Sequence, residues 1–482
     1  TFLLHRWHAT GESGLKEMVE RTLLGMARGG IHDQLGGGFH RYSVDARWTV
    51  PHFEKMLYDN AGLLKAYLDG NSALGTEEFA EVARGIVRWV REVIADPEGG
   101  YAASQDADVG LDDDGDYFTW TLDEATAVLT EDELAVAAAY YDIGTAGEMQ
   151  HHPGKNVLFV AEPLAAIALR LGRSAEQAAQ LLGSARSKLR VARDLRPAPF
   201  VDRTRYTGWN AMMAGALCRA GVVLGDDWAR NHALLTLERI RRESPEPDAI
   251  PHTPGGLGGL LDDQVQAAQA ALEAHEVTGD AGWLGWAERL MHRVWLDYWD
   301  QEAGGLFDTA RGRGGEGLLP TRAKPVQDAP TPSGNGVAAL LCARLHELTG
   351  AVLWADRRDQ LVGAIAGRAG DLGLHGATLL LAVDWCLHPA THLVVTGPEG
   401  DPRADAMHQR AMATFFPRRV VQRPHGPAST GQAIPPALAG MVAAGGGARG
   451  YACVGATCSA PAGTEEEWRA VLEGLRGGET VP

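Results

Sequence analysis

Apolar residues recur at intervals of three and four along most of this chain, the spacing that places them on one face of an α-helix. Short runs rich in glycine, proline and aspartate separate these segments and are typical of turns. The body of the protein is therefore expected to be mainly α-helical. Helices are predicted, with ends good to about 2–4 residues, at residues 14–28, 52–69, 76–95, 122–140, 174–193, 208–223, 226–243, 260–278, 282–299, 334–349, 353–369 and 375–387.

The predicted helices come in pairs that repeat. One helix ends at a glycine and the next begins soon after, often with a tryptophan, as in residues 271–280 before Trp283 and 341–350 before Trp354. Glycine just past a helix supplies the left-handed cap. Because one hairpin cannot bury its own apolar face, such repeats stack into an array. The copies are irregular and carry no capping repeat, which favours a closed ring over an open solenoid.

A second repeated element is a glycine pair followed by a hydrophobic residue, placed after the second helix of a pair. It occurs at Gly37-Gly38-Phe39, Gly99-Gly100-Tyr101, Gly255-Gly256-Leu257 and Gly304-Gly305-Leu306.

The pattern changes at Thr391. Residues 391–397, 418–422 and 451–454 have the composition of strands, whereas 401–414 and 465–475 have that of helices. Strands alternating with helices predict a small α/β unit. We therefore expect two domains, a helical barrel over residues 1–390 and a small α/β subdomain over 391–482 that packs on it.

Composition narrows the range of partners. The chain has 44 Lys and Arg against 62 Asp and Glu, a net charge of −18, so neither nucleic acid nor an anionic membrane surface is an expected partner. No apolar run reaches the ~18 residues that span a bilayer, and residues 1–10 lack the apolar core of a signal peptide. These features predict a cytoplasmic protein, and no motif for a cofactor or a metal ion stands out.

Cys453 and Cys458 form the one close pair among five cysteines. A redox motif has two intervening residues rather than four, and a zinc site needs further ligands that do not stand nearby in the sequence. A packing pair or an occasional disulfide is the favoured interpretation.

Residues 29–64 combine a glycine turn with three histidines and several acids, and they run into the start of a helix. Charged side chains are rarely buried without partners, so this density of acids and histidines predicts the wall of a polar pocket. His32 beside Asp33 is typical of a base held in one tautomer by a carboxylate. A structural hydrogen bond to the loop backbone is an equally good alternative.

Other predicted inner helices also begin with polar residues, and parallel hairpins in a ring would gather these starts at one mouth. Helix capping explains Asp262 or Asn335 taken singly, whereas His52 and Glu54 are not preferred caps. Asp106 and Asp108 alternate along an extended segment, so both can face one side. Carboxylate pairs ~5–9.5 Å apart hydrolyse glycosidic bonds. A solvated acidic turn, continued by residues 112–116, is the alternative.

Tryptophans in the motif loops are candidates for contact with a sugar ring, because an indole offers an apolar face and a polar N–H. The expected catalytic residues are His32, Asp33, His52, Glu54, Asp106, Asp108 and Asp263. The expected substrate-binding residues are His40, Trp48, Asp59, Trp120, Trp209, Asn210, Asp262 and Asn335.

These motifs also carry a resemblance, and they follow one another in the family's order. They are residues 29–64, Ser104-Gln105-Asp106-Ala107-Asp108 with Tyr117-Phe118-Thr119-Trp120, Trp209-Asn210, Leu261-Asp262-Asp263, Thr331-Pro332-Ser333-Gly334-Asn335, and Cys453 to Cys458. Over nearly its whole length the chain resembles the YyaL / spermatogenesis-associated protein 20 family, the thioredoxin-domain-containing proteins. The resemblance implies a mainly α fold, an (α/α)6 toroid of the type found in six-hairpin glycosidases and sugar 2-epimerases.

The resemblance also implies a partner. The family carries a thioredoxin-like domain with a Cys-x-x-Cys-type motif ahead of the barrel, and here no cysteine precedes Cys218. A thioredoxin-like domain, in cis or in trans, is therefore an expected partner beside a small sugar-like ligand.

The expected function is carbohydrate-directed, either isomerisation or epimerisation of a sugar or hydrolysis of a glycoside. The epimerases use histidines on late inner helices, where this chain offers only His375 and His388, neither in a recognisable motif. The available carboxylates serve hydrolysis. The alternative is a non-catalytic module that binds a ligand or partner and accompanies the thioredoxin-like domain. Convergence of the carboxylates on one cavity would favour the enzyme.

Overall fold

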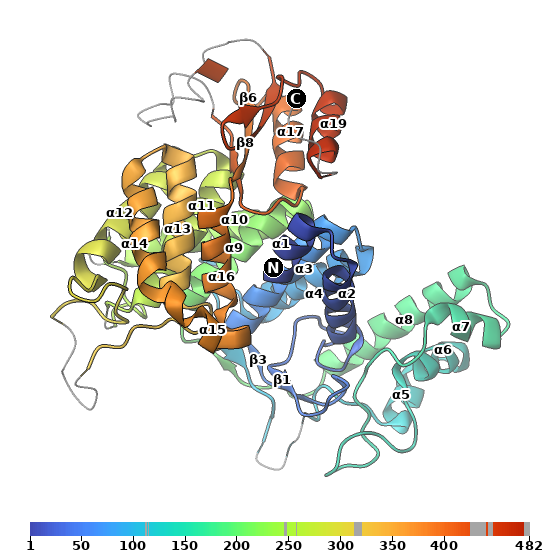
Figure 1. Cartoon of the computed structure of the whole chain (residues 1–482). Coiled ribbons are helices and arrows are strands. Elements are labelled where there is room, and N and C mark those ends of the chain that lie inside the picture. The colour runs from blue at the N-terminus through green and yellow to red at the C-terminus, as the bar shows by residue number, and fades with distance from the viewer. Residues whose placement is uncertain are drawn as a thin grey trace.

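The computed structural model describes residues 1–110, 113, 115–244, 248–256, 258–312, 321–424, 440–441 and 447–476. Within them, six helices form an inner ring (Figure 1) in which neighbours in the order given are in contact from α3 to α16. Contacts between α1 and α16, and a 3.0 Å hydrogen bond from the Thr1 hydroxyl to Asp69 of α3, close the ring. The inner helices are α1 (Phe2–Thr10), α3 (Leu57–Leu74), α9 (Thr207–Val223), α11 (Leu261–Thr278), α13 (Gly334–Thr349) and α16 (Ala377–Leu387).

An outer layer surrounds this ring, and each of its helices packs on the inner helix that precedes it in the sequence. The predicted (α/α)6 toroid of inner and outer helices is therefore confirmed. The outer helices are α2 (Ser13–Arg28), α4 (Glu77–Trp89), α10 (Asp227–Glu243), α12 (Ala281–Tyr298) and α14 (Val352–Ile365). The π-helical turn η1 (Val90–Ile94) continues α4, and η2 (Ala366–Arg368), α15 (Ala369–Leu372) and η3 (Gly373–Gly376) connect α14 to α16.

The inner and outer helices differ in how much of their surface is buried. The inner helices α3, α9, α11 and α13 are buried on most sides because they contact both neighbours and the outer layer, and small residues let them approach closely. A Cβ atom on Gly215 of α9 would lie 3.4 Å from Cα of Ala270 on α11. The predicted turn glycines also cap the inner helices, since Gly75, Gly279 and Gly350 end α3, α11 and α13 at φ of 72°, 71° and 71°.

In the described part of the chain, an amide side chain near the start of four inner helices binds the backbone that leaves the preceding outer helix. Asn210 of α9 accepts a hydrogen bond from the backbone N–H of Tyr101 at 2.7 Å and donates one to the Tyr101 carbonyl at 3.1 Å. We call this pair of bonds the amide clamp. It recurs between Asn60 and Phe39, Gln264 and Ile250, and Asn335 and Leu306.

The repeated glycine pairs stand directly before three of the clamped residues, and all six of these glycines have positive φ. Only glycine adopts that conformation without strain, and a Cβ on Gly37 would lie 2.2 Å from the carbonyl oxygen of Gly85. At the remaining clamp the bound residue is Ile250, which precedes the predicted third copy. Leu257 of that copy lies outside the described residues.

Residues 122–194 carry helices that stand apart from both rings (Figure 1): α5 (Leu122–Val128), α6 (Glu131–Tyr141), α7 (Leu164–Arg170) and α8 (Ala175–Asp194). The single helix predicted over 122–140 is wrong, because Thr130 starts a second helix through a capping box with Glu133. These helices share a hydrophobic core of their own, which includes Trp120 and Leu182. The short helices α1 and α7 were not predicted.

The helix predicted from residue 52 begins only at Leu57. The residues before it form short strands that bring distant segments together: β1 (Tyr42–Ser43) pairs with β2 (Pro51–His52), and β3 (Lys55–Met56), β4 (Ser104–Gln105) and β5 (Val201–Asp202) form an antiparallel sheet in that order. This sheet sits at the end of the barrel where the inner helices begin.

At the opposite end, a four-stranded sheet with strand order β7-β6-β8-β9 packs with α17 (Pro402–Ala413) and α19 (Glu465–Arg476) (Figure 1). The strands are β6 (Thr391–Thr396), parallel to β7 (Arg419–Gln422), and β8 (Arg449–Val454), antiparallel to β6 and to β9 (Thr457–Cys458). A disulfide joins Cys453 and Cys458 across β8 and β9, the disulfide alternative expected for this pair. The division into domains at residue 390 stays a prediction.

The longest and most apolar helices among the described residues do not meet the length and hydrophobicity that crossing a membrane requires.

The amide clamp should be a major source of barrel stability. Replacing Asn210 by Ala leaves the buried backbone N–H and C=O of Tyr101 without partners, and each such group costs about 1–3 kcal/mol. We expect Asn210→Ala to lower the midpoint of urea unfolding strongly, followed by circular dichroism. Asn231→Ala, the same change on an exposed position of α10, is the matched control. Equal midpoints for the two variants would contradict a structural role for the clamp.

Candidate functional site

The starts of the inner helices and the β3-β4-β5 sheet form the mouth of the barrel, at the end opposite the C-terminal sheet (Figure 1). Lys55 pairs with Gln105, and the two strands are antiparallel. The next residues in this register, Glu54 and Asp106, therefore lie next to each other. Two segments that lie about fifty residues apart thus meet at one site, as the sequence predicted for the His52 and Asp106 loops.

Glu54 is the centre of a group of interacting side chains. Its Oε2 atom lies 3.0 Å from Nη1 of Arg41 and 3.7 Å from Nε2 of His52. Arg41 also acts on the hydroxyl of Tyr58, the second residue of α3, and opposes the rise of its pKa that burial causes. Glu54 is therefore held in a fixed position by a cation while it remains partly open to solvent.

Asp59, the third residue of α3, lies beside this group. Burial raises the pKa of Asp59 to about 7, with a smaller contribution from the negative charge of Glu54, while Arg41 opposes the shift. Its buried Oδ2 atom has no hydrogen-bond partner among the described residues. Asp59 is thus a carboxyl group that is largely protonated below neutral pH and has a free polar atom.

Asp106 shares the acidic environment of this group. Burial raises its pKa, and the nearby charges of Glu54 and Asp202 add to that shift. Asp108 lies beyond β4, which ends at Gln105, and it is exposed, whereas Asp106 is half-buried. The expectation that the two aspartates face one side stays a prediction.

Aromatic rings continue the site from α3 to α11. Trp209 packs edge-on against Tyr58 with ring centres 4.7 Å apart and against Tyr206 at 4.6 Å. Tyr206 in turn lies 5.1 Å from the ring of His252. The half-buried indole of Trp209 therefore links the acids on α3 to those on α11.

His252 and Asp263 form a hydrogen-bonded pair on the α11 side. Nδ1 of His252 lies 3.0 Å from Oδ2 of Asp263, and the backbone N–H of Gly208 donates to Oδ1 at 2.8 Å. The bond to Asp263 raises the pKa of His252. This arrangement orients the imidazole, and among the described residues no hydrogen bond to its Nε2 atom is found.

Asp262 precedes this pair and has part of its surface open to solvent. Withdrawal from water by the surrounding protein raises the pKa of Asp262 to about 6, and the charges of Asp263 and Asp308 add to the effect. We call the continuous set from Asp106 to Asp262 the mouth arc. Its members are Arg41, Glu54, Tyr58, Asp59, Asp106, Trp209, Tyr206, His252, Asp262 and Asp263.

Other predicted site residues belong to the scaffold. Asp33 is buried, with Nζ of Lys55 at 2.7 Å and Nη1 of Arg193 at 2.8 Å. It therefore joins the first loop to α8, one of the helices of residues 122–194, which we call the insertion. His32 turns its Nδ1 atom to the carbonyl of Ala27 at 3.1 Å rather than to Asp33. The expected His32–Asp33 dyad is therefore wrong, and the alternative of a structural bond to the loop backbone is correct.

The same holds for four of the expected binding residues. His40 is buried between Phe53 and Phe118, and burial lowers its pKa to about 3. Trp120 is 1% exposed in the core of the insertion, so its placement in the pocket was wrong. The side-chain amides of Asn210 and Asn335 form the hydrogen bonds of the amide clamp.

Trp48 is half-buried and packs over Gly25 and Gly29. The backbone of Trp48 itself has a positive φ. It supports the loop behind the mouth, and a contact with a ligand stays a prediction.

Residues that the sequence interpretation missed complete the arc: Arg41, Tyr58, Tyr206 and His252. No motif in the sequence marked His252, because its partner Asp263 lies on the following helix, α11. Tyr58 and Arg41 stand inside the polar segment 29–64 and were passed over in favour of its acids and histidines.

Asp59 should make stability depend on pH. Its folded pKa of about 7 exceeds the unfolded value of 3.8, so the native state binds the extra proton and loses stability as pH rises from about 4 to 7. Three pKa units correspond to about 4 kcal/mol at most. Relative to the parent, the melting temperature of Asp59→Asn should therefore rise between pH 4 and pH 8.

The control is Asp356→Asn on the exposed face of α14, whose melting temperature should follow the parent at both pH values. A difference between Asp59→Asn and the parent that stays constant with pH would contradict the raised pKa.

The chain has sequence relatives among known proteins. No family model matches it. Spermatogenesis-associated protein 20 of Homo sapiens is 30% identical over 98% of this chain and 64% of its own length. The Mus musculus protein of that name is 28% identical over 87% of this chain and 57% of its own length. The chain thus spans about three fifths of the relatives it matches, and the resemblance seen in its motifs is confirmed.

Solved structures with a similar arrangement include a D-mannose isomerase, at 14% identity and a TM-score of 0.36 over 73% of this chain and 86% of the other. An α-1,6-mannanase from Salegentibacter sp. HEL1_6 has 12% identity and a TM-score of 0.40 over 72% and 69%. A cellobiose 2-epimerase from Bacillus thermoamylovorans B4167 has 11% identity and a TM-score of 0.34 over 70% and 82%. At these scores the likeness supports no argument about ligand or reaction.

Proposed function

We propose that this homologue of spermatogenesis-associated protein 20 binds a sugar-like ligand at the mouth of its barrel and carries out acid–base chemistry on it. The observation that supports the proposal most is the mouth arc, in which a run of aromatic rings lies between two groups of acids that include carboxyl groups with raised pKa values. Carboxylates accept hydrogen bonds from hydroxyl groups, and the faces of Trp209 and Tyr206 suit the C–H faces of a sugar.

Asp59 is the proposed general acid. A catalytic acid works best when its pKa lies near the operating pH, and that of Asp59 is about 7. In this proposal the carboxyl group of Asp59 delivers the proton to a glycosidic or hydroxyl oxygen of the ligand. Glu54, held by Arg41, is the neighbouring anion that would stabilise positive charge developing on the sugar.

Glycoside hydrolysis is the reaction that these groups favour, because it requires one acid and a second carboxylate. Sugar isomerisation or epimerisation is the second candidate, since His252 oriented by Asp263 has the arrangement of a general base. The non-catalytic alternative, in which the barrel binds a ligand or partner beside a thioredoxin-like domain, would need no proton transfer at the mouth.

A panel of mono- and disaccharides tests this proposal, with binding followed by calorimetry and conversion by nuclear magnetic resonance. For a sugar that the parent converts, Asp59→Asn should reduce kcat by about 10²–10⁴-fold and change KM little. The parent's kcat/KM should fall as pH rises through about 7, where Asp59 loses its proton. Asp356→Asn is the control of equal chemistry away from the mouth. Sugar binding that is unaffected by Asp59→Asn, without conversion by the parent, would favour the non-catalytic alternative.

A further inference from the structure

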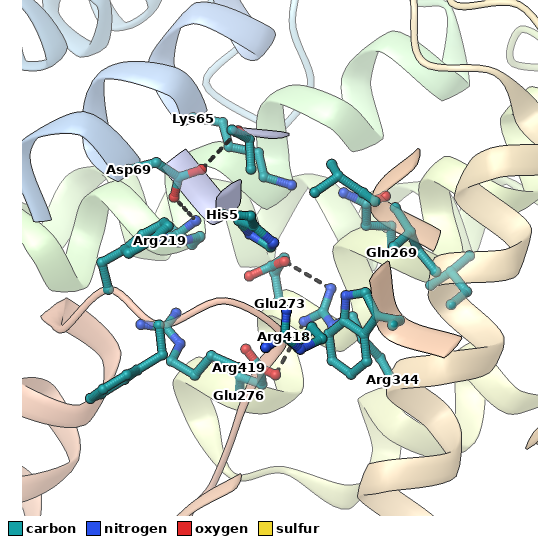
Figure 2. Close-up of a pocket in the computed structure, with 17 residues that line it drawn as sticks. His5, Lys65, Asp69, Arg219, Gln269, Glu273, Glu276, Arg344, Arg418 and Arg419 are labelled. Carbon is teal, nitrogen blue, oxygen red and sulfur yellow. Dashed lines mark hydrogen bonds and ion pairs between the residues drawn. The ribbon is translucent and has the colours of Figure 1, made fainter. Parts of the chain in front are cut away.

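A second polar site lies inside the ring, between the inner helices and the C-terminal sheet. It is a cavity of about 120 Å³ to which every inner helix contributes, from His5 of α1 to Trp385 of α16. Phe415 to Arg419, the segment between α17 and β7, closes it on the side of the C-terminal sheet. Figure 2 shows the side chains pointing into this space from all sides. A single water needs about 10–15 Å³, so the cavity admits a group of several heavy atoms.

Positive charge predominates among the side chains at the centre of this cavity. The cations are Lys65, Arg219, Arg344 and Arg419, and the carboxylates facing them are Asp69, Glu273 and Glu276. Arg418 and Asp384 also face each other as an ion pair and add no net charge. Four cations against three carboxylates leave an excess of one positive charge when all are ionised.

Two of the arginines form ion pairs with all three carboxylates. Nη1 of Arg219 lies 2.6 Å from Oδ1 of Asp69. Arg344 binds Glu273 at 2.9 Å and Glu276 at 3.2 Å. Each of these arginines keeps a buried Nε atom with no partner among the described residues.

Lys65 has no such partner. Among the described residues, no carboxylate lies within ion-pair distance of its ammonium group and no hydrogen bond reaches it, although Glu273 and Asp69 attract it over a longer range. Figure 2 shows Lys65 reaching toward the middle of the cavity. Burial lowers its pKa, and the arginines Arg219 and Arg344 add to that effect. Lys65 is half-buried, and holding its ammonium group partly out of water without a partner costs free energy, which a bound anion would offset.

The scaffold explains only part of this arrangement. The inner helices α3, α9, α11 and α13 end toward this cavity, and cations are favoured near the negative ends of helices. That effect fades beyond the last turn, and Lys65 is nine residues from Leu74, where α3 ends. Helix ends therefore account for Arg219 and in part for Arg344, but not for Lys65.

We propose that this cavity binds a phosphoryl group, held by Lys65, Arg219 and Arg344, while Arg419, whose Nη1 atom donates to backbone carbonyls around the end of α17, adds positive charge. Donors that converge from several directions suit a tetrahedral group with three terminal oxygens, and guanidinium groups match phosphate geometry. The phosphoryl group is either free inorganic phosphate or part of a phosphorylated metabolite. This site is separate from the mouth, and the proposal does not rest on the proposed function.

Thermal unfolding of the whole chain tests the proposal at one ionic strength in sodium chloride, with inorganic phosphate, glucose 6-phosphate, glucose or sodium acetate added. A ligand that binds only the native state raises the unfolding temperature. We expect stabilisation by inorganic phosphate, glucose 6-phosphate or both, and the one that acts at the lower concentration identifies the source. No response to either phosphate beyond chloride, or a larger response to acetate, would overturn the proposal.

Lys65→Gln separates binding from a structural role. Loss of one charge-assisted contact should weaken phosphate binding about tenfold or more. In chloride alone the variant should melt at or above the temperature of the parent, because an unpaired buried charge is gone. Lys16→Gln, in a surface pair with Glu20, should keep the parent's response to phosphate. A Lys65→Gln protein that is destabilised in chloride and responds to phosphate as the parent does would show that Lys65 is structural.

Discussion

The amide clamp determines how the barrel presents its functional groups. Each clamp ties an inner helix, at or near its fourth residue, to the buried backbone that leaves the neighbouring outer helix. That tie fixes both the height of the inner helix and its rotation about its own axis. The residues immediately before three of the amides are Asp59, Trp209 and Asp263, and all three belong to the mouth arc. A single repeated contact in the scaffold therefore orients acids and an aromatic ring that lie far apart in the sequence.

Polarity differs between the two ends of the ring. The mouth gathers carboxyl groups whose pKa values burial and mutual repulsion raise, while the far cavity gathers cations. Lys65 is six residues beyond Asp59 on α3, about 9 Å of helix, and Glu273 is ten residues beyond Asp263 on α11, about 15 Å. The two sites share helices but not side chains, so substitutions in one leave the contacts of the other in place.

Most of the architecture could be predicted from the sequence, because it depends on local signals. The period of apolar residues located α9 and α13 to within one residue, and turn glycines such as Gly279 and Gly350 marked their hairpins. The amide clamp could not be predicted, since Asn210 and Tyr101 are 109 residues apart, and the motifs that contain them carry no sign that they pair. The site was predicted in part for the same reason. Glu54 and Asp106 stood out as polar, but only the pairing of β3 with β4 shows that they are neighbours.

Asp33 and Lys65 show how buried charge separates scaffold from site in this fold. Both were embedded in segments that the pattern alone marks simply as polar or helical. Asp33 has two cations and two backbone N–H groups around its carboxylate, so its bonding capacity is used within the protein. Lys65, and Asp59 at the mouth, retain groups with no partner among the described residues. Burying such a group costs free energy that folding alone does not return. For Lys65 beside the cavity and Asp59 at the mouth, a ligand that completes the contacts would offset this cost.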